Sequence, residues 1–118
     1  MSADRELLLL AAKAAGIALW PVGTPWRDNS MGTGLLLFNG QLVWNPLADD
    51  GEALRLAVDL QIQFNVVLED SRGWVESPSH VKQNYYMEFQ WEIPGDRYTA
   101  TRRAIVRAAA AIGRAMPC

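Results

Sequence analysis

The clearest fold signal in the chain is the stretch Leu35-Leu36-Leu37-Phe38-Asn39-Gly40-Gln41-Leu42-Val43-Trp44. Asn-Gly readily occupies the two positive-φ positions of a type I′ turn, and here apolar residues flank the pair on both sides. The stretch therefore predicts an antiparallel β-hairpin. Two strands joined by so short a turn can pair only with each other in opposite directions, which commits this part of the chain to antiparallel structure.

Two further strands are predicted in the second half of the chain. Residues 62–69 are predicted to form a strand that ends at the turn sequence of residues 70–73. Residues 84–93 show the clearest alternation: the odd positions from Tyr85 to Ile93 are all apolar or aromatic, whereas the even positions are mostly polar. This period of two predicts a strand with one buried face and one solvated face.

Three helices are predicted at residues 3–15, 50–60 and 97–115. In the second helix, Asp49 followed three residues later by Glu52 has the spacing of a capping box. This cap precedes Leu54, Ala57, Val58 and Gln61, where a helix is predicted to follow. The third helix is rich in alanine and is stopped by Pro117.

The order helix, hairpin, helix, two strands, helix predicts an α+β fold. Short connections between neighbouring strands favour a mainly antiparallel sheet of about four strands packed with three helices, in the order αββαββα. The chain has 118 residues, of which 50% are hydrophobic, and this is sufficient for a core without disulfides or metals. Residues 1–118 are therefore expected to form a single domain.

Charge and cysteine content exclude several classes of protein. The chain has 11 basic and 13 acidic side chains, a net charge of −2, which argues against a disordered chain and against a polycationic nucleic-acid binder. The one cysteine, Cys118, allows neither an internal disulfide nor a cysteine-rich zinc site. No signal peptide or membrane span is predicted, so we expect a cytoplasmic protein.

The third predicted helix contains arginine but no acidic residue. Arg103, Arg107 and Arg114 project opposite its apolar face and are expected to point to water, where they could contact nucleic acid or an acidic partner. The alternative is that they only solvate an exposed face and complement the helix dipole. An acidic row on strand 84–93, with Glu88 and Glu92, could likewise support self-association or simply face solvent.

Tryptophan is unusually frequent, with five residues in the chain. Trp44 and Trp91 are predicted to lie in the core, whereas Trp26 and Trp74 fall in what we predict to be a long loop, 21–34, and a turn, 70–80. Large aromatic residues in loops are enriched at binding surfaces. The candidate protein-binding residues are therefore Trp26, Arg27, Asp28 and Trp74. The alternative is that the loop tryptophans cover a small core.

No catalytic or metal-binding motif is recognisable. His80 is the only histidine, and no nucleophile, base and orienting group can be named together. The carboxylates at Asp49, Asp50 and Glu52 match no calcium loop and fit a helix start. We therefore predict no cofactor and no enzymatic activity.

Two segments resemble a known family: WNPLADDGEALRLA at 44–57 and TRRAIVRAAAAIG at 101–113. They are similar to the NinX-like, or phage ABA-sandwich, proteins, and the opening helix from Glu6 to Gly16 fits the same pattern. The resemblance implies a phage or prophage origin, a bacterial cytoplasmic location and a sheet with helices on both faces, an α/β/α sandwich. It implies no activity and no catalytic residues, because the family is largely uncharacterised.

The leading functional hypothesis is a non-enzymatic accessory protein of phage or prophage origin that binds another protein, either of the host or of the phage. The second is nucleic-acid binding through the arginines of the last helix, and the third is a small-molecule enzyme. Association into a homo-oligomer is compatible with all three.

Overall fold

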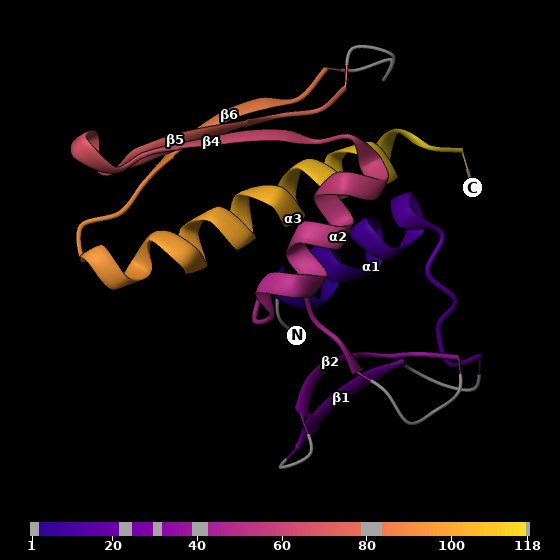
Figure 1. Cartoon of the computed structure of the whole chain (residues 1–118). Helices are drawn as coiled ribbons and strands as arrows, with labels where there is room; N and C mark the ends of the chain where they lie inside the picture. The colour runs from indigo at the N-terminus through magenta and orange to yellow at the C-terminus, as the bar shows by residue number, and fades with distance from the viewer. Residues whose placement is uncertain (1–2, 22–24, 30–31, 39–42, 79–83, 118) are drawn as a thin grey trace.

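A computed structural model describes residues 3–21, 25–29, 32–38, 43–78 and 84–117 (Figure 1). In these residues the fold has three helices and two separate antiparallel sheets of three strands each. The predicted α+β class is confirmed. The sheet arrangement differs from the prediction of one sheet of about four strands, because two additional strands form in segments that lack a strand pattern.

The helices begin and end where the sequence predicts them. Helix α1 spans Ala3–Ala15, α2 spans Asp50–Leu60 and α3 spans Arg97–Ala115, directly after the 3-10 turn η2 (Pro94–Asp96). Apolar periodicity therefore identified all three helices.

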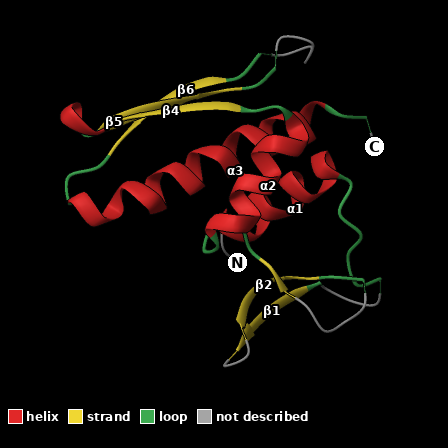
Figure 2. Cartoon of the chain, in the orientation of Figure 1, coloured by secondary structure: helices red, strands yellow, loops and turns green. Residues whose placement is uncertain are grey.

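The first sheet contains β1 (Trp26–Asn29), β2 (Gly32–Leu36) and β3 (Val43–Trp44), in that order. The second contains β4 (Gln63–Val67), β5 (Arg72–Glu76) and β6 (Tyr86–Gln90), with the 3-10 turn η1 (Leu68–Asp70) between β4 and β5. Figure 2 shows the helices lying between the two sheets. This order of layers is the reverse of the α/β/α sandwich that the family resemblance implies.

The predicted hairpin pairing is confirmed, but the predicted 21–34 loop is wrong in part. Strands β2 and β3 pair antiparallel, with Leu35 opposite Trp44, while the predicted turn at 39–40 lies outside the described residues. Strand β1 lies within the supposed loop and pairs with β2. Its sequence, WRDN, shows no apolar alternation, so pairing with β2 rather than local propensity makes it a strand.

Gly34 explains how β2 approaches β3 so closely. Its φ is +149°, and a Cβ atom there would lie 2.6 Å from the carbonyl oxygen of Trp44 and 2.7 Å from Cγ1 of Val43. Any larger residue would push β3 away from β2. Gly34, one of the glycines that suggested a loop, therefore serves a tight strand contact.

The prediction of a turn at 70–80 is also wrong in part, because this segment contains β5, the central strand of the second sheet. The turn itself is confined to η1 and Ser71, which has a left-handed backbone with φ of 52°. Strand β5 then pairs with β4 on one side and β6 on the other, and its Val75 is fully buried between Phe64 and Met87. Burial between two strands thus overrides a weak local strand signal.

Helix α3 runs through the middle of the molecule and carries most of the core contacts. Its buried residues face α1 on one side and the second sheet on the other, so the helix is covered on two sides (Figure 1). The best-buried side chains of the core come from α1, β2, β5 and α3, and include Leu8, Leu35, Val75 and Val106. Trp44 and Trp91, at 7% and 8% exposure, lie in the interior as predicted.

Candidate functional site

The most distinctive surface feature is an apolar groove, which we call the β4 groove. It has a volume of about 370 Å³ and lies between α2, β4 with η1, and the first half of α3. Its walls are formed by Asp50, Ala53, Leu54, Phe64, Val66, Leu68, Arg97, Tyr98, Thr101, Arg102 and Ile105. Most of these side chains are apolar, so the groove presents hydrophobic surface to solvent.

Five large apolar side chains on or beside this groove remain accessible in the folded chain. The exposed fractions are 54% for Leu54, 38% for Phe64, 61% for Leu68 and 53% for Tyr98, all of which line the groove. Val58, at 65%, lies one helical turn after Leu54 on α2. Together they expose on the order of 500 Å² if each side chain offers roughly 180 Å² in full, which is the size of a functional patch.

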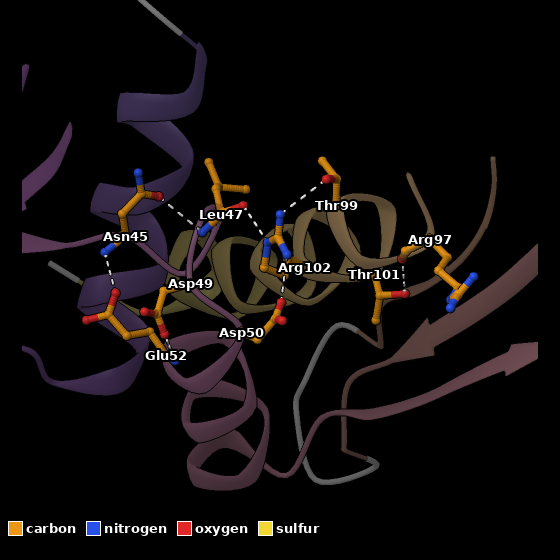
Figure 3. A network of polar contacts seen from close by, with 9 residues as sticks. All are labelled: Asn45, Leu47, Asp49, Asp50, Glu52, Arg97, Thr99, Thr101 and Arg102. Atoms are coloured by element: carbon orange, nitrogen blue, oxygen red, sulfur yellow. Dashed lines mark hydrogen bonds and ion pairs between the residues drawn. The ribbon is translucent and has the colours of Figure 1, made fainter. Parts of the chain in front are cut away.

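The helical walls of the groove are joined by Arg102 of α3 (Figure 3). Its Nε donates a hydrogen bond to the carbonyl oxygen of Leu47 at 2.8 Å, and its Nη1 lies 2.6 Å from Oδ1 of Asp50. The third nitrogen, Nη2, donates to Thr99 Oγ1 at 3.2 Å. The Arg102 side chain is only 17% exposed, so these contacts hold the start of α2 firmly against α3.

The chain before α2 is ordered by its own polar side chains (Figure 3). The Asp49 carboxylate accepts a hydrogen bond from the Glu52 N–H at 2.8 Å, as the predicted capping box requires. Glu52, however, accepts from the N–H of Asn45 at 2.9 Å, and the N–H of Asp49 donates to the Asn45 carbonyl. The helix start is thus tied to the end of β3, and these carboxylates have a structural role.

Arg97 provides positive charge at one end of the groove. Its guanidinium lies 4.9 Å from the centre of the Tyr98 ring and donates hydrogen bonds to the Pro94 carbonyl and the Tyr98 hydroxyl. Among the described residues, no carboxylate forms an ion pair with Arg97. Of the described lining residues, Asp50 alone carries a carboxylate, and it is paired with Arg102, so the guanidinium of Arg97 borders the apolar surface without an ion-pair partner in the described part of the chain.

The predicted binding tryptophans do not form a single surface. Trp26 belongs to β1 in the first sheet, where it is half-buried against the core, with Arg27 half-buried and Asp28 exposed beside it. Trp74 lies in β5 of the second sheet, half-buried and stacked on Tyr86 with ring centres 6.2 Å apart. The helices separate the two sheets (Figure 1), so the two tryptophans belong to different layers of the fold.

The three arginines of α3 that were predicted to point to solvent differ in their surroundings. Arg103 forms an ion pair with Asp4 of α1, with Nη1 3.0 Å from Oδ1, so it binds within the chain instead of pointing freely to water. Arg107 and Arg114 are exposed, and both lie close enough to Tyr85 to oppose the rise in its pKa that burial causes. Of the three arginines predicted to face solvent, Arg107 and Arg114 are exposed, whereas Arg103 is paired within the chain.

Other predicted features provide no reactive cluster. Glu88 and Glu92 are exposed, and Glu88 accepts a hydrogen bond from the Tyr86 hydroxyl at 3.2 Å. His80 and Cys118 lie outside the described residues. Within the part of the chain that the structure describes, no group of three His, Cys, Asp or Glu residues could hold a metal ion, and no helix could cross a membrane.

The β4 groove could not be recognised from the sequence. The sequence pattern did not separate Leu54 and Val58 from the buried positions of α2, which in the structure are Ala53, Leu56 and Ala57. One signal was present: α2 has two apolar stripes, and a short helix that packs on one side can bury only one of them. The second stripe is the one left exposed.

Comparisons of the chain with protein families, with curated proteins and with solved structures give no match. The resemblance to NinX-like phage proteins, and the origin that it implies, therefore stay predictions.

Proposed function

We propose that this chain is a non-enzymatic protein-binding module whose docking surface is the β4 groove. The observation that carries the proposal is the concentration of exposed apolar side chains from α2, β4, η1 and α3 around one hollow. Large exposed apolar patches on a folded chain are typical of protein-binding surfaces. A polar rim around an apolar centre, supplied here by Arg97 and Asp50, is the usual composition of such surfaces.

The polar groups of the groove favour binding over catalysis. Asp50 is the one carboxylate among the described residues of the lining, and Arg102 forms an ion pair with it. Among the described lining residues there is no Ser, Cys or His, and the Thr101 hydroxyl donates a hydrogen bond to the Arg97 carbonyl oxygen. This composition suits recognition of apolar side chains rather than chemistry on a small substrate.

The proposal can be tested by changing exposed residues that have little role in folding. Leu54→Glu places a charge inside the groove, and Phe38→Glu places the same charge on a similarly exposed residue, 63% accessible, that does not line it. Both variants and the wild type would be used to capture partners from a bacterial lysate, after circular dichroism has verified equal folding. We expect a partner that binds the wild type and Phe38→Glu but is lost with Leu54→Glu.

If Leu54→Glu retains every partner that the wild type captures, the β4 groove is not the docking surface. The Phe38 variant controls for the general effect of an added negative charge on a chain that is already acidic overall.

A further inference from the structure

The edges of the two sheets differ in how well they are protected against pairing with another chain. Unpaired edge strands attract further strands, and folded proteins block them with charges, proline or very short length. Strand β1 contains Arg27 and Asp28, β6 contains Glu88, and β3 has only two residues before the Asn45-Pro46 break. Strand β4, with the sequence QFNVV, has none of these features.

Strand β4 is also accessible where pairing would occur. It is an outer strand of its sheet, hydrogen-bonded to β5 on one side only (Figure 1). Its first three residues, Gln63, Phe64 and Asn65, are exposed. Alternate N–H and C=O groups on the side away from β5 are therefore directed outward, next to the apolar surface of the β4 groove.

We propose that the occupant of this edge is a second copy of the same chain, which pairs β4 with β4 antiparallel about a two-fold axis at Asn65. This inference rests on the proposed function, since it names the partner of the same surface. The β4-β5-β6 sheets of the two copies would then join into one continuous six-stranded sheet. The β4 grooves of the two copies would lie next to each other across the axis. A two-fold interface of this kind needs a surface that is complementary to itself.

The sequence of β4 meets that requirement. Antiparallel pairing about Asn65 places Phe64 opposite Val66 of the second copy, and Gln63 opposite Val67. Aromatic and β-branched residues are favourable cross-strand neighbours, and the central asparagine would face its own copy, where two amides can hydrogen-bond. No charged residue of β4 meets a like charge, because the strand contains none.

The size of the apolar surface also agrees with a dimer. A stable interface buries about 800 Å² on each partner, and homodimer interfaces are about 65% apolar, which corresponds to roughly 520 Å². The five exposed apolar side chains on or beside the β4 groove together provide on the order of 500 Å², if each offers roughly 180 Å² when fully exposed. The exposed apolar surface on and beside the β4 groove is therefore of the size that such an interface requires.

The test uses the residue on the two-fold axis, which is exposed and has no role in the core. Asn65→Lys would place two ammonium groups opposite each other in the dimer, and like charges across an interface weaken it strongly. We expect wild type to sediment as a dimer at high concentration and Asn65→Lys to raise the dissociation constant more than tenfold. Gln90→Lys, which adds the same charge to the opposite edge strand β6, should sediment like wild type.

Charge complementation makes the test specific for the two-fold axis. Asn65→Glu alone should also dissociate, whereas an equimolar mixture of Asn65→Lys and Asn65→Glu should restore the dimer, because opposite charges then meet. The inference is overturned if wild type remains a monomer at hundreds of micromolar, or if Asn65→Lys associates as well as Gln90→Lys. A monomeric wild type whose lysate partner is still lost with Leu54→Glu would refute the dimer and leave the proposed function intact.

Discussion

Replacing Gly113 by alanine tests the closest contact between the helices that form the core. Gly113 is buried in α3, where this helix crosses α1. A Cβ atom at this position would overlap the carbonyl oxygen of Leu10 and would lie 2.8 Å from its carbonyl carbon. Because these are backbone atoms, they cannot rotate away, and the two helices would have to separate.

The expected change in stability is the difference between two opposing effects. Alanine is favoured over glycine inside a helix by about 1 kcal/mol. Overpacking a close-packed interior costs about 1–3 kcal/mol, and the upper part of that range applies when a backbone is in the way. We therefore expect Gly113→Ala to lower the free energy of unfolding by about 1–2 kcal/mol, although helix propensity alone predicts an increase.

Urea unfolding followed by circular dichroism measures this change. Gly95→Ala is the matched control, since a Cβ atom there would meet no atom within 4 Å, and its stability should change by less than about 0.5 kcal/mol. A Gly113→Ala variant that is as stable as wild type, or more so, would refute the close packing of α1 on α3.

Two further predictions concern the helix cap and a half-buried tyrosine. Asp49→Ala removes the carboxylate that accepts a hydrogen bond from the Glu52 N–H, and it should lower the free energy of unfolding, measured in urea, by about 1 kcal/mol. Asp49→Asn should retain most of the stability, because asparagine also caps helices. Equal losses in both variants would contradict a capping role. Burial, opposed by the charges of Arg107 and Arg114, raises the pKa of Tyr85 above its ordinary 10.0, so the unfolded chain ionises first as the pH rises. Stability contributed by neutral Tyr85 should be complete below pH 10 and decline above it, and Tyr85→Phe should flatten that decline; parallel curves for the variant and wild type would exclude Tyr85 as the cause.

The helices could be predicted from the sequence because their determinants are local. Apolar spacing marked all three, and the Asp49 cap lies next to the helix that it starts. The β2–β3 pairing was also predictable, since its two strands are close in sequence. Such short-range features depend on few residues, and each leaves a pattern that can be read without knowledge of the fold.

The candidate site could not be predicted in the same way. The β4 groove combines residues from α2 and β4 with Tyr98 and other residues of α3, which lie tens of positions away in the chain. No single one of these residues is unusual in its local sequence. Their exposure becomes visible only when the neighbouring elements are in place and leave one side of them uncovered.

The sequence by itself determined the α+β class, the extent of the helices and the placement of Trp44 and Trp91 in the core. Only the tertiary structure decided that β1 and β5 are strands, that the strands divide into two sheets, and that the helices lie between them. The physical reason is that a strand is stabilised by hydrogen bonds and side-chain contacts to its neighbours, which local sequence does not specify. The same reason explains why the unprotected edge of β4 could be recognised only after its partner strands were known.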